Sequence, residues 1–226
     1  MNFTERSYGG NIFRPRPEIE FSDADQFLCI TTPWGARDSA EKLNHSIRDR
    51  FLSARSDKES TSPFDRLSCI SSIANDLRIS MKLANDILYA ENNREDYTSG
   101  AELLALASDG DEVVWGQLGL PAVYLDRPNS PLIPLTNSAD LATELSSANL
   151  KLAPLPSKLI GIDTHTDFEM HSIKPRTGEG LIFLSRSFVP AGFFDLAYGS
   201  RTTEEISRVC SEDDPDLPFW VGRLDF

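Results

Sequence analysis

A run of short apolar segments separated only by turns limits the folds open to this chain more than any other feature of its sequence. Ala101–Ala107 and Glu112–Gln117 are joined by Ser108-Asp109-Gly110-Asp111, and Ala122–Leu125 follows a few residues later. Neighbouring parallel strands need a crossover of a dozen or more residues, and these links are too short to provide one. The segment is therefore predicted to form an antiparallel sheet.

Two helical patterns precede this run of strands. Residues Asp38–Ala54 place Leu43, Ile47 and Phe51 on one face of a helix. A longer helix is predicted to begin with Ser62 as N-cap and Pro63 in its first position, and its apolar stripe runs from Leu67 to Leu88. A helix with such a stripe must bury one face, so both helices are expected to cover a sheet.

Further elements complete the expected order along the chain. They are a β-ribbon of Glu18–Phe21 and Gln26–Thr31, a short helix over residues 138–145, strands at Ile162–Ile173 and Leu181–Leu184, a helix that opens at Thr202, and a last strand at Phe219–Leu224. Helices placed between groups of antiparallel strands predict two antiparallel sheets packed face to face with helices outside, an α-β-β-α sandwich. We expect one domain over residues 1–226, with residues 1–13 as a candidate flexible segment.

Composition excludes several classes of partner. The formal charge of −13 disfavours a nucleic-acid backbone or an anionic membrane surface. No apolar stretch approaches the roughly 20 residues that a transmembrane helix needs, and the N-terminal residues lack a signal-peptide core. The three cysteines, Cys29, Cys69 and Cys210, are odd in number and far apart, which is typical of reduced thiols. These features predict a cytoplasmic protein.

The stretch Phe27–Asn44 combines an apolar strand, a turn containing Gly35 and a helix, and other landmarks follow it in order. They are Arg14-Pro15-Arg16-Pro17-Glu18-Ile19, Ala84-Asn85-Asp86-Ile87, Ser99-Gly100-Ala101, Gly119 with Tyr124 and Arg127, Leu135-Thr136, and Gly178-Glu179-Gly180 leading into Leu181-Ile182-Phe183-Leu184-Ser185. Together they resemble the metal-dependent Ser/Thr protein phosphatases of the 2C type, in their compact bacterial form. The resemblance spans nearly the whole chain and implies that family's fold.

The same resemblance implies that the family's metal site is degenerate here. Four carboxylates that hold divalent cations in the family correspond to Ile19, Thr32, Arg186 and Asp216, and Pro33 stands where the family has a glycine whose carbonyl is a ligand. Magnesium and manganese need several oxygen ligands, mostly carboxylates, and a guanidinium repels them. The sequence therefore predicts no metal cofactor, no catalytic residue and a pseudophosphatase that serves as a protein-binding or regulatory module.

Three arginines could give this module a ligand. Arg14 corresponds to an arginine that contacts phosphate in the family, and with Arg16 and Arg186 it could form an anion pocket that holds a phosphorylated residue without hydrolysing it. The expected partner is then a Ser/Thr kinase or a phosphoprotein. Ordinary loop arginines are the competing interpretation for Arg14 and Arg16, and Arg186 could be a surface side chain or could pair with Asp216.

Two alternatives stay open on the sequence alone. Asp163, His165 and Asp167 alternate along a predicted strand and could share a metal-binding face, which would suit a divergent phosphatase that uses Mg²⁺ or Mn²⁺. In the other alternative the chain is a structural subunit that contacts its assembly through the Phe219-Trp220 edge. Cys29 lies within an apolar strand, so we expect core packing there and no nucleophile.

Overall fold

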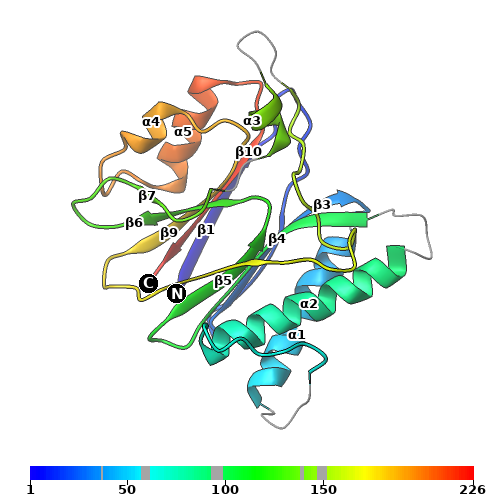
Figure 1. Cartoon of the computed structure of the whole chain (residues 1–226). Helices are drawn as coiled ribbons and strands as arrows, with labels where there is room; N and C mark the ends of the chain where they lie inside the picture. Colours follow the sequence, from blue (N-terminus) through cyan, green and yellow to red (C-terminus); the bar gives the residue numbers. More distant parts are fainter. Residues whose placement is uncertain (37, 57–61, 93–98, 138–139, 147–151) are drawn as a thin grey trace. The chain divides into compact units, whose positions relative to one another are not determined.

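Two antiparallel five-stranded sheets contain the strands of the described part of the chain, and each has its own helices (Figure 1). This computed structural model covers residues 1–226 and describes all of them except 37, 57–61, 93–98, 138–139 and 147–151. The chain divides into two compact units. Unit 1 comprises Met1–Arg16, Gly119–Ser157 and Pro175–Phe226, and unit 2 comprises Pro17–Leu118 and Lys158–Lys174.

The sheet of unit 2 has the strand order β2-β3-β4-β5-β8. Its strands are β2 (Glu18–Ser22), β3 (Phe27–Gly35), β4 (Ser99–Ser108), β5 (Val113–Leu118) and β8 (Glu169–Ile173). The predicted ribbon β2-β3 and the hairpin β4-β5 are both present, and every neighbouring pair is antiparallel. The antiparallel sheet expected from the short links is confirmed.

Helices α1 (Asp38–Ser56) and α2 (Ser72–Asn92) cover one face of this sheet. Their apolar stripes meet alternate strand residues in a core that includes Cys29, Leu103, Ala105 and Val114. A Cβ atom at Gly116 would lie 2.6 Å from the Sδ atom of Met81, so only glycine lets α2 approach β5 this closely. Amphipathic burial therefore positions both helices.

The predicted start of the long helix at Ser62 is wrong, because α2 begins at Ser72. The side chain of Asn75 accepts a hydrogen bond from the Leu67 backbone N–H at 2.8 Å and donates to the Leu67 carbonyl at 2.9 Å. Ser71 Oγ accepts from the backbone N–H of Ala74 at 3.4 Å. These bonds hold residues 67–71 as a loop and leave Leu67 exposed. The cap signal at Ser62 is therefore overridden by these side-chain to backbone hydrogen bonds, which favour a loop.

The predicted strand Ile162–Ile173 is also longer than the observed one, since β8 begins at Glu169. Asn85 on α2 donates to the Asp163 carbonyl at 3.0 Å and accepts from the Gly161 backbone N–H at 2.9 Å. Its Oδ1 atom also accepts from the Thr166 hydroxyl. The asparagine thereby holds residues 161–166 in a turn, and a shared strand face for Asp163 and its neighbours does not form.

Unit 1 contains the second sheet, with the order β1-β10-β9-β6-β7. Its strands are β1 (Asn2–Tyr8), β10 (Phe219–Asp225), β9 (Gly180–Ser185), β6 (Ala122–Asp126) and β7 (Ile133–Pro134). The candidate flexible segment 1–13 contains β1, which pairs with β10 over its whole length. Phe219 and Trp220 therefore lie in an inner strand and are buried, so the edge required by the structural-subunit alternative is absent from them.

The described residues of unit 1 form three helices: α3 (Leu141–Leu145), α4 (Ala191–Phe194) and α5 (Thr203–Asp213). Thr202 accepts a hydrogen bond from the Glu205 backbone N–H, as its predicted N-cap position requires. Ile206 and Cys210 of α5 pack with Phe193 of α4 on one face of the sheet. None of the described helices has the length and apolar character that crossing a bilayer demands.

Candidate functional site

The carboxylate of Asp140 is the centre of a buried polar cluster in unit 1. Its Oδ2 atom lies 3.3 Å from Arg14 Nη1 and accepts a hydrogen bond from Ser187 Oγ at 2.5 Å. Its Oδ1 atom accepts from the backbone N–H of Thr143 at 3.0 Å and caps the N-terminus of α3. The side chains of Arg14 and Asp140 are only 3% and 0% exposed. The carboxylate of Asp140 thus forms an ion pair with Arg14, the arginine that was expected to contact phosphate.

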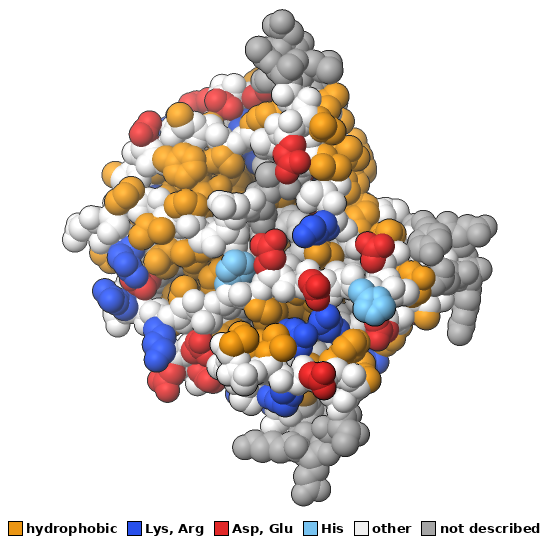
Figure 2. Space-filling view, viewed as in Figure 1, with side chains coloured by type: hydrophobic (Ala, Val, Ile, Leu, Met, Phe, Trp, Pro, Cys, Tyr) orange, Lys and Arg blue, Asp and Glu red, His pale blue; other side chains and the backbone are white. Residues whose placement is uncertain are grey.

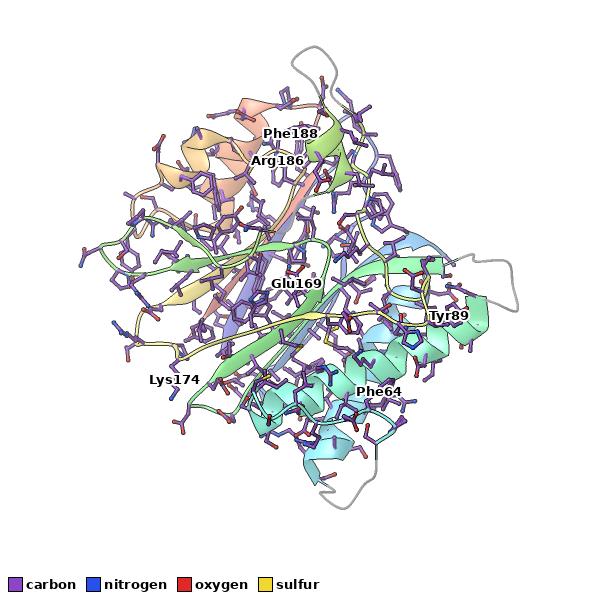
Figure 3. The ribbon with its side chains drawn as sticks, in the orientation of Figure 1. Phe64, Tyr89, Glu169, Lys174, Arg186 and Phe188 are labelled. Atoms are coloured by element: carbon purple, nitrogen blue, oxygen red, sulfur yellow. The ribbon has the colours of Figure 1, made fainter. Side chains whose placement is uncertain are left out.

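Arg186 is held at the C-terminal end of α5, beside Phe188 (Figure 3). Its Nη2 atom donates to the Cys210 carbonyl at 2.9 Å, and its Nη1 atom lies 3.2 Å from Asp213 Oδ2. A cation at this end of a helix interacts favourably with the helix dipole and with the last unpaired carbonyls. The side chain is fully buried, so Arg186 is neither a surface arginine nor the partner of Asp216.

The other two unit 1 positions lie at the surface. Arg16 donates to Glu5 Oε1 at 3.1 Å, and its side chain is 60% exposed. Asp216 accepts a hydrogen bond from Asn11 Nδ2 through its carboxylate, and its backbone carbonyl accepts from the N–H of Asn11 and Ile12. Arg14, Arg16 and Arg186 therefore each engage a different carboxylate, and their contacts within unit 1 do not bring them onto one anion.

The remaining family positions lie in the sheet of unit 2. Ile19 on β2 pairs with Ile30, and Thr32 and Pro33 on β3 stand opposite Glu102 and Ala101. Thr32 Oγ1 is buried and has no hydrogen-bond partner among the described residues. Its neighbour Trp34 donates from Nε1 to Glu102 Oε2 at 3.1 Å. The strand is thus formed as predicted but is longer than expected, because β3 continues to Gly35 and pairs with β4 where a turn was predicted, and it has no carboxylate at position 32.

These residues do not fit the divalent cations that the fold family implies. One buried threonine hydroxyl, an isoleucine side chain and a buried guanidinium replace hard anionic oxygen donors. Within the described ranges, no group of three or more His, Cys, Asp and Glu side chains is placed to hold a metal ion. We therefore derive no catalytic step through a metal at these positions.

The alternative metal ligands have separate partners. Asp167 pairs with Lys82 on α2 at 3.2 Å, and His165 Nδ1 lies 2.9 Å from the hydroxyl of Thr164. The Asp163 carbonyl is bonded to Asn85. Because residues 161–166 form a turn and no strand, the period-2 alternation that would align the three side chains does not apply.

The buried thiols are poorly suited to act as nucleophiles. Burial raises the pKa of the Cys29 thiol far above its ordinary value, and Cys29 packs in the core as predicted. Burial likewise raises the pKa of Cys210 to about 11, although the nearby Arg186 lowers it. Both thiols stay protonated at neutral pH, and the thiolate is the reactive form.

Sequence reasoning did not identify Asp140 as part of the site. Its position before Leu141-Ala142-Thr143 is a recognisable N-cap signal, so its link to α3 could have been found. Its contact with Arg14 joins residues 126 positions apart in the sequence, and no local sequence pattern predicts a contact over such a separation.

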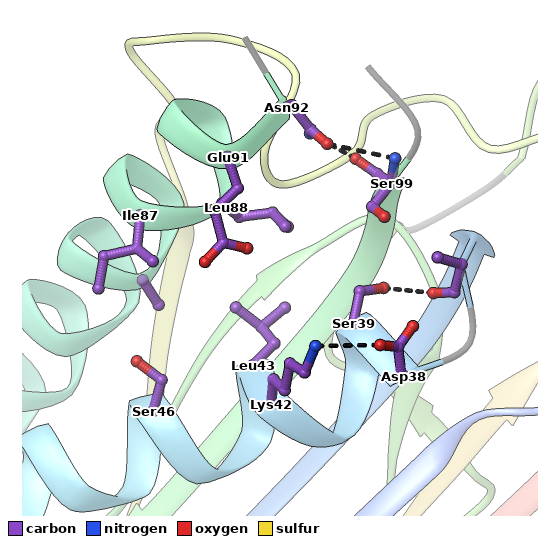
Figure 4. Close-up of a pocket in the computed structure, with 12 residues that line it drawn as sticks. Asp38, Ser39, Lys42, Leu43, Ser46, Ile87, Leu88, Glu91, Asn92 and Ser99 are labelled. Carbon is purple, nitrogen blue, oxygen red and sulfur yellow. Dashed lines mark hydrogen bonds and ion pairs between the residues drawn. The ribbon is translucent and has the colours of Figure 1, made fainter. Parts of the chain in front are cut away.

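A small cavity of about 210 Å³ lies between the N-terminal half of α1 and the C-terminal half of α2 (Figure 4). Lys42 and Asp38 form an ion pair on its rim at 3.0 Å. Asn92 closes one end by bonding to Ser99 through both its amide nitrogen and its amide oxygen. The polar groups at this end are mutually satisfied, so the cavity offers few of them to a ligand.

Comparison with solved structures identifies the fold. The serine/threonine phosphatase PstP/Ppp of Mycobacterium tuberculosis matches with a TM-score of 0.69 at 11% identity, over 100% of this chain and 98% of that one. PppA, described as a key regulatory component of the type VI secretion system (T6SS) in Pseudomonas aeruginosa, matches with 0.69 at 12% identity, over 100% and 97%. The PPM Ser-Thr phosphatase MsPP of Mycobacterium smegmatis matches with 0.68 at 16% identity, over 100% and 98%.

No protein-family model matches the sequence, and no curated protein does. At these identities the structural matches establish the fold alone. The chain has the protein phosphatase 2C-like fold of the PPM phosphatases, with two antiparallel five-stranded sheets and flanking helices, as the sequence landmarks predicted.

Proposed function

We propose that this chain is a catalytically inactive protein of the phosphatase 2C-like fold that binds a protein partner in Ser/Thr phosphorylation signalling. The burial of Arg186 is the main observation that supports this proposal. This residue stands at a position where the family has a metal-binding aspartate, and its guanidinium is buried against the end of α5. A cation fixed in this way repels a divalent metal, and exposing it would break the contacts that stabilise the helix end.

The Arg14–Asp140 pair supports the same proposal. In an active enzyme of this fold the corresponding arginine is expected to contact the phosphate group of the substrate. In this chain the Arg14 guanidinium pairs with the carboxylate of Asp140, which also accepts hydrogen bonds from the Ser187 hydroxyl and the Thr143 backbone N–H. Binding a substrate phosphate through Arg14 would require that cluster to be broken first, which weakens any such binding.

A protein partner fits the surface and the comparisons. On the face shown in Figure 2, lysine and arginine side chains lie among acidic ones and no broad basic field is present. The similar structure PppA is described as a regulatory component of a secretion system. We therefore propose a regulatory protein–protein contact with a kinase or a phosphoprotein. The net charge and the three free cysteines support a cytoplasmic setting for it.

Catalysis is tested by adding Mn²⁺ or Mg²⁺ to the purified chain in a calorimeter and by measuring turnover of a phosphoserine peptide. We expect no binding heat above the buffer blank and no release of phosphate. Turnover that is abolished by Asp216→Ala or Asp163→Ala would overturn the proposal, since it would show a working metal site.

The partner is tested by affinity capture from the native source, with and without prior phosphatase treatment of the lysate. We expect a stoichiometric partner, identified by mass spectrometry, whose capture weakens after treatment. Capture that is unchanged by phosphatase treatment would remove phosphorylation from the proposal.

A further inference from the structure

An arginine-lined cavity lies in unit 2, and its lining includes none of the positions that correspond to the family's metal site. It has a volume of about 680 Å³, within the range of ligand sites in proteins. It is lined by the C-terminal half of α1, Ser62 and Arg66 before α2, the first half of α2 and Asp109 of the β4-β5 turn. Three of its lining residues are arginines in a chain whose net charge is −13: Arg50, Arg55 and Arg66.

Two of these arginines have no carboxylate partner among the described residues. Arg50 donates from Nε to Ser46 Oγ at 3.3 Å, and the guanidinium of Arg55 lies 5.6 Å from the centre of the Phe51 ring. In the part of the chain that the structure describes, neither forms an ion pair with a carboxylate. Other arginines of this unit do, as Arg48 shows with Asp25. A cavity with two guanidinium groups in this state favours an anion.

The remaining lining groups strengthen this preference. Arg66 is fixed by Asp76 at 2.7 Å and by the Ser72 hydroxyl, so that carboxylate is already neutralised. Asp109 accepts hydrogen bonds from the backbone N–H groups of its own turn, which disperse its charge. Helix α2 begins at the cavity with no acidic residue in its first turn, so the positive end of its dipole adds to this preference.

A second cavity of about 490 Å³ adjoins the first, since Arg55 and Asp109 line both. Together they are larger than a free phosphate ion needs. Serine hydroxyls at Ser53 and Ser72 lie on the wall and can donate to phosphate oxygens. The size, the guanidinium groups and the hydroxyls together fit a phosphate group carried on an extended chain.

We propose that this arginine-lined cavity binds a phosphorylated Ser/Thr segment of a partner protein, with Arg50 and Arg55 contacting the phosphate. The site is distinct from Arg14 and Arg186, whose charges are used internally. The proposal goes beyond the inactive phosphatase assignment and does not require it, because binding here involves no residue of the family's metal site.

Fluorescence anisotropy with a labelled phosphoserine peptide tests the site on the full chain. We expect binding that weakens with salt, and at least a tenfold weaker affinity for the unphosphorylated peptide. Arg50→Ala with Arg55→Ala should weaken binding by about tenfold or more, because hydrogen bonds to charged groups are involved. Arg78→Ala with Arg208→Ala removes the same charge outside the cavity and should leave the affinity within about twofold.

Each other outcome decides against the proposal. Loss of binding in Arg16→Ala with no effect at Arg50 and Arg55 would place the phosphate near Arg16, in the anion pocket expected from the sequence. Binding of inorganic phosphate alone with equal affinity would show a free-anion site. Equal binding of the unphosphorylated peptide would show an acidic or nonspecific contact. Circular dichroism confirms that the Arg50 and Arg55 variant is folded, and Arg50→Lys with Arg55→Lys, which keeps the charge, should bind with intermediate affinity.

Discussion

Replacing Asp140 by asparagine is expected to destabilise unit 1 by about 3 kcal/mol, the lower end of the cost of breaking a buried ion pair. The Arg14 and Asp140 side chains are 3% and 0% exposed, so water cannot replace the lost carboxylate. Asparagine keeps an oxygen for the Thr143 backbone N–H, and the α3 cap therefore survives. Asp140→Ala removes the cap as well, which adds about 1 kcal/mol.

Differential scanning calorimetry measures this effect. For a chain of this size, about 1 kcal/mol shifts the melting temperature by roughly 2–4 °C, so Asp140→Asn should lower it by about 6–12 °C. Glu144→Gln is the matched control, since Glu144 is an exposed acid on the same helix and should change stability by less than about 0.5 kcal/mol.

The reasoning also predicts coupling between the two residues. Arg14→Met in the Asp140→Ala background removes a buried charge, so the double variant should be more stable than the sum of the single variants predicts. A melting temperature for Asp140→Asn within about 2 °C of wild type, or additive single variants, would refute the idea that this pair is buried and internally matched.

Three further predictions follow from the site. Thr32→Val should be neutral or stabilising by up to about 1 kcal/mol, because Thr32 Oγ1 is buried without a hydrogen-bond partner among the described residues. Thr31→Val should cost about 1–2 kcal/mol, because it breaks the hydrogen bond from Thr31 to Asn44. Urea titration measures both, and a larger loss of stability at Thr32 than at Thr31 would contradict the view that Thr32 Oγ1 lacks a partner. Arg186→Asp should cost about 3–5 kcal/mol, since it buries an anion against helix carbonyls; a scan that shows no loss of melting temperature would contradict this role. Desolvation lowers the pKa of His171 below its ordinary value of 6.5, so the unfolded chain binds more protons than the folded chain and stability falls as the pH drops below about 6.5. His171→Phe keeps the ring stacked on Trp115 and should flatten this dependence in thermal melts from pH 7.5 to 5. An unchanged slope of stability against pH would contradict the prediction.

Local patterns predicted most secondary structure and failed where an asparagine side chain bonded to the backbone of another segment. The hairpins β2-β3 and β4-β5 follow from short apolar segments joined by short turns. The start of α2 and the turn at 161–166 did not follow, because Asn75 and Asn85 bond to backbone groups of neighbouring loops and hold them out of regular structure. Single amides of this kind leave no periodic signal in a sequence.

The candidate site divides in the same way. The landmark order predicted the fold and the chemical identity of the groups at positions 19, 32, 186 and 216. The partners of the arginines were not predictable: Arg186 pairs with Asp213 and not with Asp216, and Arg14 pairs with Asp140. The arginine-lined cavity could not be predicted from the sequence either, because its lining residues come from separate segments that share no motif.

The sequence by itself determined the antiparallel strands, the amphipathic helices and the replacement of carboxylates by threonine and arginine. These depend on residue type and on spacings of a few residues, which are properties of the chain before it folds. Only the tertiary structure decided which charges are neutralised internally and which face a cavity. Ion pairing depends on distance and burial in space, and residues far apart in the sequence acquire both only when the sheets and helices pack.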